Sequence, residues 1–114
     1  VAQVSELQKQ VVNVHVDQSV LDYISSLVEA SRSHSNVRIG VSPRGTLALY
    51  KSTQALAAIR GRDYVIPEDV KELCRPVFAK RLILTGQATI RGATGENVID
   101  SLLDSVSTPT LPEE

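Results

Sequence analysis

The stretch from Ser42 to Gly61 most constrains the fold, because it contains a start signal and a stop signal for one long helix. Ser42 is a suitable N-cap, since its hydroxyl can accept a hydrogen bond from a free N–H of the first turn. Pro43 suits the first helical position, where an N–H would be unpaired in any case. Gly61 is a typical residue just after a helix end. The pattern predicts a helix that begins after Ser42 and ends near Arg60.

Apolar residues occur on most faces of this predicted helix. A helix that is apolar all round is usually buried, and small alanines allow close packing of its neighbours. We therefore expect it to be the central, most buried helix. Its apolar residues are Leu47, Ala48, Leu49, Tyr50, Ala55, Leu56, Ala57, Ala58 and Ile59.

Three further segments have apolar residues on one side at helical spacing. The first begins after Asp17, a good N-cap, and ends near Arg32. The second begins at Pro67, and Pro76 is expected to kink or interrupt it. The third follows Thr94, its expected cap. These segments predict helices that pack their apolar sides together.

The remaining segments are short. Residues 4–13 predict a short N-terminal helix, 63–66 are β-like, 82–84 predict a short strand, 85–93 an irregular loop and 108–114 a frayed tail. The fold class is therefore all-α, a bundle of about four to five helices with at most very short strands.

Length and composition bound the class of protein. A chain of 114 residues with 42% hydrophobic content fits a single domain, 1–114, with a modest core over about 14–107. The net charge of −1 gives no electrostatic case for nucleic acid or a membrane surface. No transmembrane segment or signal peptide is visible, and the single cysteine excludes an internal disulfide. Because the chain begins at Val1 and has no methionine, we expect it to be part of a longer protein.

Arg44 is the candidate functional residue. It lies in a first helical turn, where the helix end favours anions, and its guanidinium has the shape to bind phosphate. The chain has no phosphate-binding loop of its own: Gly40 and Gly45 have the required spacing, but Thr46 stands where a lysine is needed. Another part of the molecule would have to hold the phosphate.

Other charged pairs have simpler explanations. Glu68 and Asp69 resemble a catalytic carboxylate pair, but acids are expected in a first helical turn. Arg62 and Asp63 are expected to stabilise a local turn, which contributes little at a surface.

The remaining reactive side chains do not form a predicted site. Cys74 lies on the apolar face of its helix and is expected in the core. His15 and His34 have no further ligands at metal spacing, so no metal site is expected. Residues 40–44 fail the nucleophile-elbow pattern at its last position.

Four segments, in the same order, make the chain resemble the C-terminal lid domain of MoxR-type AAA+ ATPases. Ser31, Ile66 and Lys80 depart from the family pattern, which often has threonine, threonine and histidine there, so no role is transferred to Ile66 or Lys80. The matching segments are Asp22-Tyr23-Ile24 with Leu27-Val28-Glu29-Ala30-Ser31-Arg32, then Gly40-Val41-Ser42-Pro43-Arg44, then Gly61-Arg62-Asp63-Tyr64-Val65-Ile66-Pro67-Glu68-Asp69-Val70, and Lys80-Arg81-Leu82.

The resemblance implies a role in a composite ATP site. The family's lid packs over nucleotide held by a preceding α/β domain, which is absent from this chain. Arg44 would be the second-sensor residue that contacts the ATP phosphates, and Ser42 and Pro43 would position the start of its helix. The lid alone would be no enzyme and would bind no cofactor, whereas the parent would hydrolyse ATP with Mg²⁺.

The resemblance also implies partners. Such ATPases form rings, usually hexameric, in the cytoplasm and act as chaperone-like remodellers of other complexes, often beside proteins with a von Willebrand factor A domain. The lid would contact its own ATPase domain and neighbouring subunits.

Two alternatives remain open on the residues alone. The chain could be a stand-alone helical adaptor that binds a partner protein without nucleotide. A nucleic-acid-binding domain is disfavoured by the charge balance, although arginines occur near helix ends at Arg32, Arg44, Arg60 and Arg62.

Overall fold

Four long helices dominate the computed structural model, which describes residues 14–110. They are α2 (Gln18–Ser33), α3 (Pro43–Ile59), α4 (Pro67–Phe78) and α6 (Gly95–Ser105). Between them lie β1 (Val37–Ile39), the 3-10 turn η1 (Ala79–Arg81), β2 (Ile83–Leu84) and the short helix α5 (Gly86–Ile90). The all-α expectation is confirmed. The helix predicted over 4–13 lies outside the described residues.

Helix α2 begins at its predicted N-cap. The Asp17 carboxylate accepts a hydrogen bond from the Ser19 N–H at 3.0 Å, which satisfies one of the donors left free at a helix start. The one-sided apolar pattern predicted for this segment corresponds to the inward face of α2. Its buried residues are Val20, Tyr23, Ile24, Leu27, Val28 and Ser31.

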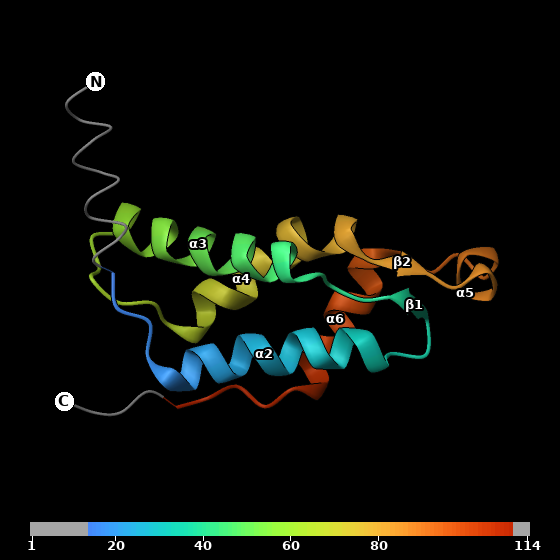
Figure 1. The fold of residues 1–114 in the computed structure, drawn as a ribbon, viewed down its shortest axis with the longest axis horizontal. Helices are drawn as coiled ribbons and strands as arrows, with labels where there is room; N and C mark the ends of the chain where they lie inside the picture. The colour runs from blue at the N-terminus through green and yellow to red at the C-terminus, as the bar shows by residue number, and fades with distance from the viewer. Residues whose placement is uncertain (1–13, 111–114) are drawn as a thin grey trace, which may run out of the picture.

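The expectation that α3 is the central helix is wrong. Helix α3 packs against α4 and α2, whereas α2 and α4 each contact all three of the other long helices. In Figure 1, α3 runs along one side of the molecule and α2 along the other. Leu47 and Ile59 are 51% and 70% exposed. The buried residues recur about every four positions. Alanines tolerate exposure, so counting them as apolar residues wrongly predicted a helix buried on all sides. That face consists of Gly45, Leu49, Thr53, Gln54 and Ala57.

Helix α4 is not interrupted at Pro76. It continues to Phe78, and η1 follows at once. Proline removes a hydrogen bond near the end of a helix, where the last turn often tightens to 3-10 geometry. The expected break is therefore replaced by a change of helix type after Phe78.

A small antiparallel sheet joins segments that lie far apart in the sequence. The strand predicted over 82–84 is confirmed as β2, and β1 pairs with it although no strand was predicted there. The loop predicted over 85–93 contains α5, whose cap is the Thr85 hydroxyl, 3.1 Å from the Ala88 N–H. The β-like segment 63–66 forms one bridge to His15 and no longer strand.

The core lies between α2, α3, α4 and α6. Its largest fully buried side chains include Leu27, Leu49, Phe78 and Ile99. Cys74 is 1% exposed, and burial raises the pKa of its thiol to about 12. The expectation that Cys74 is a core residue is confirmed. Within residues 14–110, every helix is too short or too polar to cross a bilayer.

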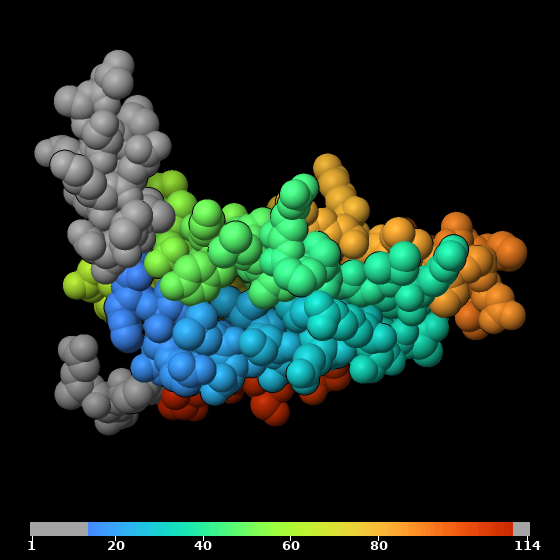
Figure 2. Space-filling view, in the orientation of Figure 1, coloured from blue at the N-terminus to red at the C-terminus, as the bar shows by residue number. Residues whose placement is uncertain are grey.

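The β1–β2–α5 region projects from one end of the helices (Figure 1). The space-filling view shows α2 and α3 side by side on one face, with this region narrowing beyond them (Figure 2).

Candidate functional site

The start of α3 is a capped helix end with an arginine in its first turn. Ser42 is the N-cap, and its Oγ accepts from the Gly45 N–H at 3.2 Å. Pro43 occupies the first turn. Arg44 follows it with an exposed side chain, so the residue lies in the first turn, at the positive end of the helix dipole. The predicted cap and helix start are confirmed.

Two residues at the end of α2 hold the segment that leads into α3. The Ser31 hydroxyl accepts from the Val41 N–H at 3.2 Å, and Arg32 Nη2 donates to the Val41 carbonyl at 3.1 Å. A Cβ on Gly40 would lie 2.6 Å from Arg32 Cγ and 2.9 Å from the Arg32 backbone nitrogen. Close packing therefore explains why a glycine stands at position 40. Besides complementing the dipole of α2, Arg32 holds the segment before α3 through its hydrogen bond to Val41. Sequence reasoning missed both contacts because they join residues nine and ten apart.

The turn η1 lies against the same helix start. A Cβ on Gly45 would lie 3.0 Å from Arg81 Cδ, so the Arg81 stem covers the first turn of α3. Its Nε donates to the Val77 carbonyl at 3.0 Å. The start of α3 is thus held from two sides, by the end of α2 and by η1.

Arg44 makes no ion pair within residues 14–110. An unpaired guanidinium at a helix N-terminus can bind a phosphate without losing a protein partner.

An open groove of about 480 Å³ runs along α2 and α3 and ends beside the first turn of α3. Its walls are mainly apolar, which suits packing against another protein surface. They consist of Leu21, Ile24, Ser25, Val28, Glu29, Arg32, Pro43, Thr46, Leu47 and Tyr50.

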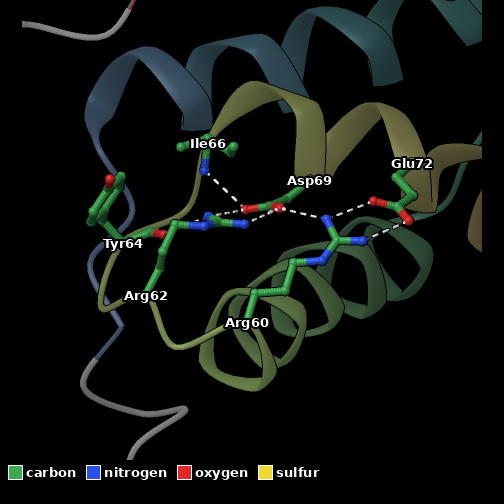
Figure 3. Close-up of polar contacts among 6 residues, drawn as sticks. All are labelled: Arg60, Arg62, Tyr64, Ile66, Asp69 and Glu72. Carbon is green, nitrogen blue, oxygen red and sulfur yellow. Dashed lines mark hydrogen bonds and ion pairs between the residues drawn. The ribbon is translucent and has the colours of Figure 1, made fainter.

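A second polar cluster lies at the opposite end of α3, where the chain turns into α4 (Figure 3). The Asp69 side chain is fully buried. Arg62 reaches it with both terminal nitrogens, at 2.8 and 2.7 Å, and also donates to the Tyr64 carbonyl at 3.1 Å. Asp69 Oδ2 accepts from the Ile66 N–H at 3.0 Å. Asp69 therefore makes the half of a capping box in which the third helical residue accepts from the N-cap N–H, while Ile66 has no side-chain acceptor for the first turn.

Arg60 joins this cluster to the surface. Its guanidinium lies 3.7 Å from Asp69 and 2.8 Å from Glu72 (Figure 3). Helix α3 ends in a Schellman motif where it enters this corner. The Arg62 N–H donates to the Ala57 carbonyl, and Gly61 has a φ of 75°. Gly61 is the predicted helix stop.

The expectations for this corner need correction. Arg62 pairs with Asp69, not with its neighbour Asp63. The Asp69 side of the pair is fully buried and Arg62 is 20% exposed, so it is not a minor surface contact. Asp69 is engaged by two arginines and Glu68 is exposed, so the two acids do not form a catalytic pair. The sequence shows an arginine seven residues before an acid. That spacing predicts an ion pair only when the path of the chain between the two residues is known.

We expect the Asp69 contacts to make stability depend on pH. Burial alone raises the pKa of Asp69, but the hydrogen bonds from Arg62 and Ile66 and the charges of Arg62 and Arg60 outweigh it and hold that pKa below its ordinary value. In the unfolded chain the aspartate has its ordinary pKa of about 3.9, so near and below that pH the unfolded chain binds more protons than the folded chain. Stability therefore falls as pH falls. The free energy of unfolding should decrease from about pH 5 downward through the lowered pKa.

Urea unfolding at a series of pH values measures this effect, with Asp69→Asn as the comparison. The variant should be less stable at neutral pH and show a shallower acid dependence. The Ser19 hydrogen bonds also lower the pKa of Asp17, so part of the dependence should remain. An unchanged slope in Asp69→Asn would contradict the assignment.

Neither histidine side chain takes part in the contacts of the two clusters. His15 Nε2 is 4.0 Å from Asp17, and His34 Nδ1 accepts from the Asn36 N–H at 3.0 Å. No group of potential metal ligands is present among residues 14–110.

The matched family agrees with this fold. The model of the AAA lid domain family matches residues 29–102, which include α2 from Glu29, the Ser42-Pro43-Arg44 helix start and the Arg62–Asp69 corner. Chaperone MoxR1 of Mycobacterium tuberculosis is 37% identical over 92% of this chain and 30% of its own length. The chain is an AAA lid domain of the MoxR family.

Two further relatives extend the comparison. The uncharacterized protein YeaC of Bacillus subtilis is 39% identical over 90% of this lid domain and 32% of its own length. The crystal structure of a proposed ATPase from Cytophaga hutchinsonii superposes with a TM-score of 0.87 at 29% identity, over 92% of this chain and 34% of that one. The lid domain thus spans about a third of the length of these relatives.

Proposed function

We propose that this lid domain completes the ATP site of a longer MoxR-type ATPase and that Arg44 contacts the nucleotide phosphates. The observation that carries the proposal is an exposed arginine, unpaired among the described residues, in the capped first turn of α3. A positioned cation that neutralises charge on a transferring phosphoryl group speeds its transfer.

The two-sided support of α3 favours a positioning role. Ser31 and Arg32 hold Val41, and the Arg81 stem covers Gly45. A guanidinium on a rigid support places its charge at little entropic cost. Because this contact forms only when nucleotide is bound, it couples nucleotide state to the position of the lid, with a coupling energy of about 1–3 kcal/mol.

The wider assembly belongs to the same proposal. An ATP-binding α/β domain and Mg²⁺ would complete the site, and the apolar groove between α2 and α3 would pack against that domain. The subunits would form a cytoplasmic ring, hexameric by family resemblance, that remodels or assembles other complexes with chaperone-like activity. Proteins with a von Willebrand factor A domain are proposed partners.

Replacement of Arg44 should impair ATP turnover by the full-length protein. We expect Arg44→Ala to lower kcat/KM for ATP by tenfold or more, which corresponds to at least ~1.4 kcal/mol of transition-state stabilisation. Steady-state ATP hydrolysis and nucleotide titration on the same preparations measure turnover and affinity.

Lys51→Ala is the matched control, because Lys51 is an exposed cation two turns further along α3. It should leave turnover unchanged, and both variants should unfold at the wild-type temperature. Unchanged turnover and affinity in a folded Arg44→Ala protein would overturn the proposed role.

The adaptor function is the second candidate, and the open apolar groove favours it. It predicts a stable complex with a partner protein in the absence of nucleotide. Leu47 is half exposed on the groove wall, so Leu47→Glu should abolish such a complex.

A further inference from the structure

The region that projects beyond the helices has an unusual surface, and we call residues 37–39 and 83–91 the tip. Three of its isoleucines face solvent: Ile39 is 52% exposed, Ile83 49% and Ile90 87%. Ile39 and Ile83 are cross-strand partners of β1 and β2, so their side chains are neighbours. The tip therefore presents apolar surface that the domain's own core does not use.

Local structure directs these side chains outward. The register between β1 and β2 is irregular between Val37 and Ile39, and such irregularities re-aim a side chain. As a result Val37 is buried while Ile39 is not. In α5, Ala88 is 1% exposed and anchors the turn, which leaves Ile90 at its outer end.

The sequence segments that form and flank the tip carry charges of one sign. Residues 30–62 and 73–95 contain no aspartate or glutamate, although the whole chain has a net charge of −1. Arg38 and Arg91 adjoin Ile39 and Ile90 in sequence, and neither makes an ion pair within residues 14–110. Four of the five ion pairs there involve Arg60, Arg62 or Arg75, which lie outside the tip.

We propose that the tip is a docking surface for an acidic protein segment that also carries aliphatic side chains. Unpaired cations with no acid among them attract such a segment, and the isoleucines bury its apolar residues. The sheet has two strands among the described residues. Because β1 lies against α2, β2 is the strand to which an extended segment would add. This surface does not depend on the proposed nucleotide site.

Two other anionic partners fit the tip less well. Single-stranded nucleic acid is bound with aromatic side chains on which bases stack, and the tip residues include no aromatic. A lipid bilayer would leave the sheet-edge N–H and C=O groups without partners. An extended acidic polypeptide would pair with the cations, cover the isoleucines and hydrogen-bond to the sheet edge at the same time.

The test uses the full chain and a fluorescein-labelled peptide in which glutamates alternate with valines. We expect saturable binding by fluorescence anisotropy, with NMR amide shifts that gather on residues 37–39 and 83–91. Ile90→Ser and Arg91→Glu should each weaken binding about tenfold or more, which equals ~1.4 kcal/mol. The same peptide with lysines in place of glutamates should bind at least tenfold more weakly.

Matched controls lie at distant exposed positions. Ile59→Ser and Lys51→Glu make the same changes on α3 and should leave binding unchanged. Absence of peptide binding, amide shifts located elsewhere, or tighter tip-dependent binding to a single-stranded DNA oligonucleotide or to phosphatidylserine vesicles would each overturn the proposal.

Discussion

Arg62→Ala should destabilise the lid domain by about 3–5 kcal/mol, because it leaves the buried Asp69 carboxylate without its main partner. The Asp69 side chain is fully buried and that of Arg62 is 20% exposed, so water cannot replace the lost hydrogen bonds well. The variant also frees the Tyr64 carbonyl that Arg62 holds. Urea unfolding at neutral pH, followed by circular dichroism, gives the change in free energy.

Arg75→Ala is the control for loss of an arginine–carboxylate pair. Arg75 and Asp100 bridge α4 and α6, but their side chains are 54% and 43% exposed, and solvent-accessible pairs contribute about 0–1 kcal/mol. The double variant Arg62→Met with Asp69→Asn should lose less stability than the sum of the single changes, because no uncompensated charge remains. A loss in Arg62→Ala no larger than in Arg75→Ala would show that Asp69 does not need its partner.

Gly95→Ala should also be strongly destabilising. A Cβ at Gly95 would lie 2.2 Å from the Ala79 carbonyl oxygen and 3.0 Å from its carbon. Backbone atoms cannot swing aside as a side chain can, so α6 would have to move away from η1. Overpacking of this kind costs about 1–3 kcal/mol, and we expect a value at the upper end.

Gly86→Ala is the matched control, since Gly86 begins α5 as Gly95 begins α6 and has nothing within 4 Å of an added Cβ. That variant should unfold like the wild type. Thermal and urea unfolding of the two variants, side by side, separate the close contact from the general cost of replacing glycine. Equal stability of Gly95→Ala and wild type would mean that α6 and η1 are not packed this closely.

Local chemistry explains which parts of this fold were predictable. The caps of three long helices depend on residues within three positions of each helix start, so Asp17, Ser42 and Thr94 were found from the sequence. The role of Asp69 as the hydrogen-bond acceptor at the start of α4 was not found. A carboxylate in a first helical turn is already explained by the helix dipole. The buried position of Asp69 depends on Arg62, which lies in the turn before α4.

The missed elements have the same origin. Strand β1 exists because the chain returns to pair Val37 with Leu84, and α5 is a single turn fixed by Ala88 in the core. Neither has a repeating pattern long enough to recognise. The place of α3 was misjudged because its face is defined by neighbours, and polar Thr53 and Gln54 are buried on it while Leu47 is exposed.

In the candidate site too, the local features were predictable and the long-range contacts were not. The helix start around Arg44 was predictable from three consecutive residues. The supports from Ser31, Arg32 and Arg81 were not, because they come from α2 and η1 and meet α3 only in the folded chain.

The chain enters the described domain at Val14, where it is fastened to the C-terminal part of α3. The Gln54 amide donates to the Val14 carbonyl at 3.1 Å in the core, and the backbone of His15 hydrogen-bonds to Asp63 and Val65. Arg44 lies ten residues from Gln54 along the same helix, which is about 15 Å at the helical rise. Because α2 and η1 hold its first turn, α3 moves with the rest of the domain. A rotation of the domain by about 10° about Gln54 would displace Arg44 by roughly 2.6 Å, close to the difference between a hydrogen bond and no contact.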